Sequence, residues 1–214
     1  MTIRIRSSGE PDAARAALDA TVAECLRRAG SVVYGRDGDP LAAVVGRMLV
    51  ERGATLATAE SCTGGMLGGL VTDIAGSSAW YLGGFVTYAN ERKVADLAVP
   101  DSTLARFGAV SHDTAIAMCR GALVRTDARF AISTTGVAGP GGGSESKPVG
   151  TVYIAVAERG GSAWSRRFHF PGDRATVRSR AAHLALASLR FALLGQADRP
   201  LLWSEGEAVR VERA

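Results

Sequence analysis

Residues 55–74 read TLATAESCTGGMLGGLVTDI: a short apolar segment, a polar turn and a second apolar segment. The first segment has the length and composition of a buried strand, and the second fits a helix over about residues 64–74. In an α/β sheet, the turn after such a strand lies at the carboxyl end of the strand, where ligand sites form. Gly64 and Gly65 would let a ligand approach the first amides of the helix. This stretch therefore predicts a strand–turn–helix unit with a candidate site at the turn.

Strand and helix patterns keep alternating after this unit. Further strands and helices are expected at residues 84–88, 111–124, 130–134 and 174–194. Residues 151–158 and 163–170 are two more strand patterns, and the Gly160-Gly161 connection between them is typical of a β-hairpin. Alternation of this kind places helices on both faces of a sheet. We therefore expect an α/β fold of three layers, α/β/α, with a mixed, mostly parallel sheet.

The chain is expected to divide into three parts. They are a helical appendage (1–40), a main domain (41–195) and a C-terminal tail (196–214). The tail is polar and weakly patterned, so we expect it to be loosely held. In the appendage, residues 13–29 fit a helix capped by Asp12, and residues 32–34 fit a short strand. Asp39 would cap the first helix of the main domain, with Pro40 as its first residue.

The composition excludes several classes of protein. With 214 residues, of which 47% are hydrophobic and 21% charged, the chain is long enough for one packed domain and is neither disordered nor a coiled coil. Charges interrupt every apolar stretch before it reaches the ~18 residues of a membrane span, and no signal-peptide pattern follows the N-terminus. Three widely spaced cysteines form neither a disulfide framework nor a metal-ligand pattern. These features favour a cytoplasmic protein without a membrane partner.

The distribution of charge argues against a nucleic-acid partner. The 25 basic residues are spread along the chain among 21 acidic ones, and the net charge of +4 gives a modest preference for small anionic ligands. Of these 25 residues, 23 are arginine, and the two lysines are Lys93 and Lys147. Lysine can lose its proton near neutral pH and arginine cannot, so a lysine in such a chain is a candidate for chemistry, although chance could also leave two.

Ser61 is the candidate nucleophile in the turn after the first quoted strand. Its hydroxyl oxygen could attack a carbonyl carbon while the amides of residues 63–65 stabilise the oxyanion. The alternative is that Ser61 and Thr63 only cap the helix. Cys62 is a rival nucleophile, but no histidine lies nearby in sequence to activate it, so burial is the stronger expectation for this thiol.

A serine nucleophile needs a base, and the histidines are poor candidates for it. Ser111-His112-Asp113 holds the three residue types of a catalytic triad, but neighbours in sequence cannot line up side chain to side chain. Ser111 fits the N-cap of a helix better. His169 lies in an expected strand and His183 in an expected helix, where packed or solvated histidine is more common. No cluster of residues suggests a metal site.

Lys93 is the alternative base. It follows the expected strand 84–88, and Asn90 could cap the helix that contains it. To act as a base the amine must be neutral, which requires a pKa lowered from ~10.4 to ~7–8 by desolvation or by a neighbouring cation such as Arg92. The competing interpretation is a solvated surface lysine.

Residues 134–150 form a glycine-rich segment after another apolar strand. Thr135, Ser144 and Lys147 could donate hydrogen bonds to an anion or a sugar. The segment lacks the ending of a P-loop and the spacing of a dinucleotide fingerprint. A flexible linker is the alternative, but the short distance between the flanking strands favours a loop at an active site.

The start of the last helix carries two arginines on one face. Arg174 and Arg178 are four residues apart, and Asp173 can cap the helix. The arginines could bind a phosphate, or they could form salt bridges that fix the helix to the sheet. The residues leave both roles open.

Together these segments resemble the CinA C-terminal domain family, whose members include the nicotinamide-nucleotide amidases. The resemblance covers about residues 41–194. Its motifs are Ala59-Glu60-Ser61-Cys62-Thr63-Gly64-Gly65, Tyr88-Ala89-Asn90 with Lys93, Gly108-Ala109-Val110-Ser111, Thr135-Gly136-Val137-Ala138-Gly139-Pro140 with Lys147-Pro148-Val149-Gly150, and Gly172-Asp173-Arg174. Residues 1–40 are similar to the end of the segment that precedes this domain in longer family members. The nucleotide-binding domain of those proteins is absent here, so no pyrophosphatase activity is expected.

The resemblance implies hydrolysis of the carboxamide of nicotinamide mononucleotide to nicotinate mononucleotide and ammonia, without a metal or other cofactor. It implies Ser61 as nucleophile and Lys93 as base, and we expect Tyr88 to orient one of the two. The expected substrate-binding residues are Thr63, Gly64, Gly65, Thr135, Gly136, Gly139, Gly141, Gly142 and Lys147. A non-catalytic nucleotide-binding or sensor module and an amidase for another small carboxamide remain alternatives. A homodimer is compatible with the sequence.

Overall fold

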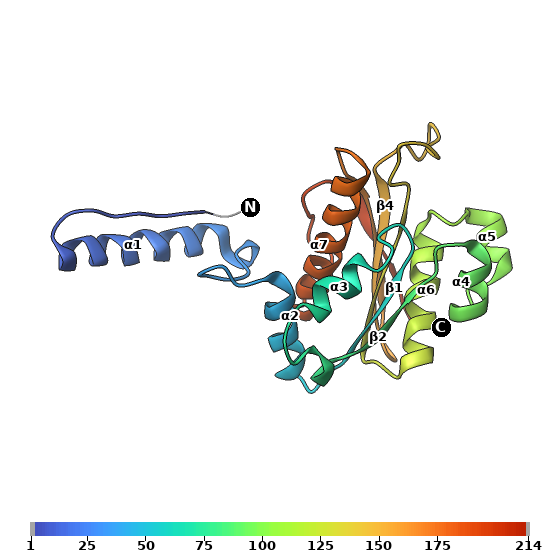
Figure 1. The fold of residues 1–214 in the computed structure, drawn as a ribbon, viewed down its shortest axis with the longest axis horizontal. Coiled ribbons are helices and arrows are strands. Elements are labelled where there is room, and N and C mark those ends of the chain that lie inside the picture. Colours follow the sequence, from blue (N-terminus) through green and yellow to red (C-terminus); the bar gives the residue numbers. More distant parts are fainter. Residues whose placement is uncertain (1–2, 213–214) are drawn as a thin grey trace. The chain divides into compact units, whose positions relative to one another are not determined.

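The computed structural model describes residues 3–212 of the chain (Figure 1). These residues fall into two compact units that divide between Asp39 and Pro40. The first unit contains helix α1 and a short 3₁₀ helix, and the second contains the sheet and the other helices. Within the described residues, no helix is both long and apolar enough to cross a membrane.

The first unit differs from the sequence expectation at both ends of its helix. Helix α1 spans Pro11–Ala29 and its N-cap, Glu10, makes no side-chain hydrogen bond, so the predicted Asp12 cap is wrong. Asp12 lies instead within the first turn, where a negative charge favours the helix dipole. The predicted strand at residues 32–34 is also wrong, because residue 32 ends the 3₁₀ helix Gly30–Val32 and residues 33–34 have no regular secondary structure.

The second unit is built on one six-stranded sheet with the order β2-β1-β3-β4-β5-β6. The strands are β1 (Leu56–Glu60), β2 (Tyr81–Val86), β3 (Phe130–Gly136), β4 (Thr151–Glu158), β5 (Ala163–His169) and β6 (Ser204–Val211). The predicted mixed α/β sheet and the β4–β5 hairpin are confirmed. The sheet is not mostly parallel as expected, because two strand pairs are parallel and three are antiparallel. The antiparallel pairs are β3–β4, the β4–β5 hairpin and the pair of β5 with the added strand β6.

Helices cover both faces of this sheet, which confirms the predicted three layers (Figure 1). One side carries α2 (Leu41–Val50), α3 (Met66–Thr72) and α7 (Arg174–Leu193), and the other carries α4 (Asn90–Leu97), α5 (Asp101–Phe107) and α6 (His112–Thr126). A 3₁₀ helix, Ser77–Ala79, precedes β2. Successive strand residues face opposite sides, so Leu56 joins the core under α7 and Ala57 joins the core under α6.

The C-terminal segment is a strand of the sheet, not a loosely held tail. Strand β6 pairs with β5, and an ion pair of 2.8 Å between Arg167 Nε and Glu205 Oε2 joins the two strands. We expected residues 196–214 to be loosely held because they are polar and show no clear strand pattern. An edge strand faces solvent along one side and therefore tolerates charged residues.

The structure tests four predicted helix caps. The side chains of Ser111 and Asp173 accept hydrogen bonds from the amides of Thr114 and Thr176, which confirms both caps. The predicted caps at Asp39 and Asn90 are wrong by one residue each, because Pro40 and Ala89 occupy the N-cap positions. Asn90 is therefore the first residue of α4, and its side chain lines a cavity instead of capping the helix.

Candidate active site

The candidate site lies where the strand order of the sheet reverses. Strand β1 connects to β2 on one side, whereas β3 leads to β4 on the other, so the reversal falls between β1 and β3. The carboxyl ends of the parallel strands at such a point form a ligand crevice. A cavity of about 220 Å³ opens there. Its lining residues are Ser61, Cys62, Tyr88, Asn90, Lys93, Ala109, Val110, Thr135, Gly136, Ala138 and Arg174.

The cavity brings Ser61 and Lys93 together from two separate strand–helix junctions. The Nζ atom of Lys93 lies 3.2 Å from Ser61 Oγ. It also donates to the backbone carbonyls of Thr87 at 3.0 Å and Tyr88 at 3.3 Å. Lys93 is 1% exposed, so the interpretation of a solvated surface lysine is wrong. Its burial lowers the pKa of the Lys93 amine, because the charged form loses its hydration.

Lys93 Nζ donates to all three of its partners, and two of them, the backbone carbonyls, could also accept both N–H groups of a neutral amine. A neutral amine has two N–H donors and one lone pair. The carbonyls of Thr87 and Tyr88 can accept both donors, which leaves the lone pair directed toward the remaining partner, Ser61 Oγ. Once the amine is neutral, the serine hydroxyl would donate to the lysine nitrogen, which is the geometry that a general base needs.

Glu60 organises the turn around Ser61, a role that the sequence analysis missed. Its carboxylate accepts hydrogen bonds from the amides of Gly65 at 2.9 Å, Leu67 at 3.0 Å and Gly68 at 2.8 Å. The side chain is 2% exposed. Glu60 therefore satisfies the N-terminal amides of α3, and the alternative in which Ser61 and Thr63 cap this helix is wrong. The position of a charged residue, Glu60, at the end of an apolar strand could have indicated this role from the sequence.

The amides of Gly64 and Gly65 are already used within the turn. Gly64 N donates to the Ser61 carbonyl at 3.1 Å, and Gly65 N donates to Glu60. The expectation that these two amides stabilise an oxyanion is therefore wrong. Within the described chain, the amides of Cys62 and Thr63 donate to no carbonyl or carboxylate, so these two remain for an oxyanion next to Ser61.

The other candidate nucleophile and bases do not form a second catalytic pair. Cys62 is 5% exposed, and burial raises the pKa of its thiol to about 12, so the thiol stays protonated. His112 contacts Ser165 Oγ at 3.1 Å through Nδ1 on the α6 side of the sheet, and no histidine lines the cavity. Between residues 3 and 212, no group of three or more histidine, cysteine or acidic side chains is placed to hold a metal ion.

The start of α7 ties together the loops around the cavity. Arg174 donates to the Tyr88 hydroxyl at 2.7 Å and to the Gly139 carbonyl at 2.8 Å. Arg178 donates to the Thr63 carbonyl at 2.7 Å. Of the two roles that the sequence left open, Arg178 therefore has the structural one, although its partner is a carbonyl and not a carboxylate. Arg174 has a structural role too and also lines the cavity.

Only part of the predicted substrate-binding set reaches the cavity in the described structure. Thr135 and Gly136 line it, whereas Thr63, Gly64, Gly65, Gly139, Gly141, Gly142 and Lys147 do not. Thr63 Oγ1 is buried against Thr134 Oγ1 at 2.7 Å. Lys147 Nζ donates to the Phe107 carbonyl at 3.0 Å, which fastens the tip of the glycine-rich segment to the end of α5. The cavity is also lined by Ala109, Val110 and Ala138, which were not predicted from the sequence.

The role of Glu60 gives a first prediction, Glu60→Gln. We expect this variant to lower the free energy of unfolding by about 1–3 kcal/mol, because the glutamine NH₂ group cannot accept and leaves a buried amide of α3 without a partner. Urea unfolding followed by circular dichroism measures this change. The matched variant Glu51→Gln, at an exposed position, should match the wild type. A Glu60→Gln protein as stable as Glu51→Gln would contradict the role.

The fold and the cavity define a three-layer α/β protein with a serine and a buried lysine facing one cavity at the switch point of its sheet. Residues 38–193 match the family model described as "CinA C-terminal domain". The chain therefore belongs to the CinA C-terminal domain family, as its sequence motifs indicate.

Related proteins include both long and short members of the family. The chain is 49% identical to a "Putative competence-damage inducible protein" of Symbiobacterium thermophilum, over 82% of this chain and 43% of the relative. It is 52% identical to "Nicotinamide-nucleotide amidohydrolase PncC" of Escherichia coli K12, over 68% of this chain and 88% of the relative. The chain thus spans less than half the length of CinA-like relatives such as the first.

Solved structures show the same fold. A CinA superfamily protein from Klebsiella pneumoniae has a TM-score of 0.70 at 39% identity, covering 72% of this chain and 96% of that one. A competence/damage inducible protein from Agrobacterium tumefaciens has a TM-score of 0.68 at 41% identity, covering 75% and 99%.

Proposed function

We propose that this protein hydrolyses the carboxamide of nicotinamide mononucleotide to nicotinate mononucleotide and ammonia. The observation that carries the proposal is the 3.2 Å contact between Ser61 Oγ and the buried amine of Lys93 inside the cavity. A hydroxyl with an adjacent neutral amine is an activated nucleophile of the kind that acyl transfer requires. The name of the Escherichia coli relative, a nicotinamide-nucleotide amidohydrolase, supports the choice of substrate.

The first half of the reaction transfers the acyl group to the serine. Ser61 Oγ attacks the carboxamide carbon while Lys93 Nζ takes the hydroxyl proton. The amides of Cys62 and Thr63 stabilise the oxyanion that forms. When this intermediate collapses, the C–N bond breaks and Lys93 returns the proton to the leaving nitrogen, so that ammonia departs and an acyl ester remains on Ser61.

The second half repeats these roles with water. Lys93 takes a proton from a water molecule as its oxygen attacks the ester carbon. The C–O bond to Ser61 then breaks and Lys93 returns the proton to the serine oxygen, so that the product leaves as a carboxylic acid and loses its proton to solvent. Each half thus begins and ends with the same neutral amine, which the burial of Lys93 favours.

The lining of the cavity suggests how the substrate lies, with its carboxamide at the buried end and its phosphate at the exposed end. Ser61 and Lys93 are buried and would hold the carboxamide, and the apolar side chains of Ala109 and Val110 suit the pyridine ring. Arg174 is exposed, and it would bind the phosphate. Its guanidinium is already oriented by Tyr88 and Gly139, which reduces the cost of ordering it on binding.

The variant Arg174→Gln tests this orientation of the substrate. A charge-assisted hydrogen bond contributes about 1.5–3 kcal/mol, so we expect kcat/KM for nicotinamide mononucleotide to fall roughly 10- to 100-fold. Nicotinamide riboside, which lacks the phosphate, should be hydrolysed equally by the variant and the wild type. Arg125→Gln, at an exposed position on α6, is the matched control. An equal loss for both substrates in Arg174→Gln would contradict a phosphate contact.

Ammonia release by the purified wild type separates the proposed function from its alternatives. Turnover of nicotinamide mononucleotide, faster than that of free nicotinamide, supports the proposal because remote phosphate contacts then assist the chemistry. Binding of the mononucleotide without ammonia release would indicate a sensor module. Faster release from free nicotinamide would indicate an amidase for another carboxamide.

A further inference from the structure

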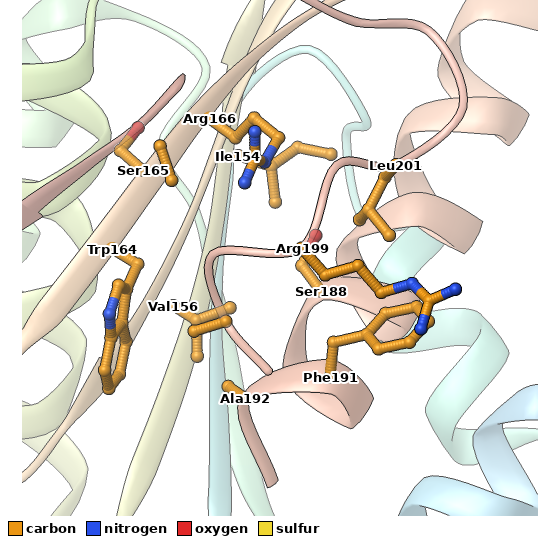
Figure 2. A pocket seen from close by; sticks show the side chains of 12 residues that line it. Ile154, Val156, Trp164, Ser165, Arg166, Ser188, Phe191, Ala192, Arg199 and Leu201 are labelled. Atoms are coloured by element: carbon orange, nitrogen blue, oxygen red, sulfur yellow. The ribbon is translucent and has the colours of Figure 1, made fainter. Parts of the chain in front are cut away.

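A second cavity lies on the α7 side of the sheet and shares no residue with the active-site cavity. It has a volume of about 20 Å³, is partly open to solvent, and is lined by residues of β4, β5, the end of α7, the segment that leads into β6 and β6 itself. Figure 2 shows Arg166 beside Ile154 on one side of this cavity, and Arg199 beside Phe191 on the other. The proposed catalytic function uses none of these residues.

Arg166 places a positive charge inside the core of the protein. It lies in β5 opposite Ile154 of β4, on the face that packs against α7. Its neighbour Ser165 faces α6 instead, where its hydroxyl contacts His112. Arg166 is 5% exposed, whereas most arginines keep their charge in water.

The hydrogen bonds of Arg166 satisfy donors but do not neutralise the charge. Its two Nη atoms donate to the carbonyls of Asp198, at 2.9 Å, and Gly206, at 3.3 Å. Burial lowers the pKa of the guanidinium, and the negative charge of Asp198 opposes this effect in part. In the described chain no carboxylate lines the cavity; Arg199 also contributes to the lining, and its guanidinium lies over the ring of Phe191. A buried cation without a matched anion is costly, and a small anion would remove that cost.

The size of the cavity limits what it can hold. A volume of about 10–15 Å³ is enough for one water molecule. At about 20 Å³ the cavity has room for a small species such as water or a monatomic ion. The apolar walls from Ile154, Val156 and Phe191 disfavour a strongly hydrated ion.

We propose that this cavity is a binding site for one monovalent halide-sized anion, such as chloride, held by the guanidinium of Arg166. The anion would neutralise charge between the sheet and the segment that carries Asp198 and Gly206. Binding would therefore stabilise the folded protein and, in particular, the attachment of the C-terminal strand.

Urea unfolding of the full chain in sodium chloride and in sodium gluconate, at equal ionic strength, tests the site. A ligand at ten times its Kd lowers the unfolding equilibrium constant about tenfold, so we expect a higher urea midpoint in chloride. Arg166→Met should abolish this difference. Arg167→Met is the matched control, because this adjacent arginine is paired with Glu205 at 2.8 Å, and the chloride effect should persist in it. Equal midpoints for the wild type in both salts would overturn the proposal.

Two further measurements separate this site from others. The chloride effect on the urea midpoint should persist in Arg174→Gln. If the effect disappears in Arg174→Gln but persists in Arg166→Met, the anion binds in the active-site cavity and the proposal is overturned. Should Arg166→Met fail to fold, crystals of the wild type grown in sodium bromide give an independent result. We expect an anomalous peak beside the Arg166 guanidinium, and density for water alone at that position would overturn the proposal.

Discussion

Lys93→Met is expected to lower kcat for ammonia release from nicotinamide mononucleotide by about 10²- to 10⁴-fold, the range that general acid–base catalysis contributes. Methionine fills a similar volume but has no lone pair of comparable basicity for the Ser61 hydroxyl. The proposed substrate contacts of Arg174, Ala109 and Val110 are unchanged in this variant, so KM should change little. Steady-state assays of ammonia release measure both constants.

The variant Lys93→Arg tests whether residue 93 acts as a base or only through its positive charge. Arginine keeps the positive charge and a similar reach, but it does not lose its proton near neutral pH. We therefore expect a loss of activity as large as that in Lys93→Met. Undiminished activity in the arginine variant would remove lysine from the mechanism, because a charge alone would then suffice.

The pH dependence follows from the lowered pKa of Lys93. As pH rises through this pKa the free enzyme gains the neutral amine, so kcat/KM should rise with pH at a midpoint below the ordinary ~10.4 of lysine. In the unfolded chain Lys93 returns to its ordinary pKa and binds more protons between the two values. The free energy of unfolding should therefore rise with pH in that window, and Lys93→Met should reduce this rise.

The sequence predicts those features that depend on neighbouring residues. Apolar runs give the strands β1, β3, β4 and β5, and the Ser111 and Asp173 caps follow from residues three positions apart. The two lysines in an arginine-rich chain direct attention to Lys93. Its position after a strand, like that of Ser61, suggests that both side chains reach one edge of the sheet.

Features that depend on distant contacts could not be predicted in this way. Strand β6 exists because β5 offers a free edge, which the polar sequence 204–211 does not reveal. The hydrogen bond of Lys147 to Phe107 spans 40 positions, and it keeps the lysine out of the cavity that the glycine-rich segment was expected to line. The role of Glu60 could not be predicted for the same reason, because it depends on α3 placing the amides of Leu67 and Gly68 against the carboxylate at the end of β1.

Ser61→Ala is expected to reduce kcat for the same substrate by about 10³-fold or more, because without the hydroxyl oxygen no acyl ester can form. Lys93 should remain buried and its carbonyl partners are untouched, so the variant should fold and still bind the mononucleotide. Ser77→Ala, at a buried serine in the 3₁₀ helix before β2, is the matched control and should retain full activity.

Mass spectrometry of acid-quenched wild type during turnover adds a direct measurement of this serine. We expect an acyl adduct of the substrate on the peptide that contains Ser61, and no adduct in Ser61→Ala. Full activity in Ser61→Ala would exclude this residue as nucleophile. An adduct on Cys62 would instead assign the attack to the thiol, against the protonated state that its pKa of about 12 imposes. Because Lys93 Nζ contacts Ser61 Oγ, the serine is the nucleophile that this amine can activate.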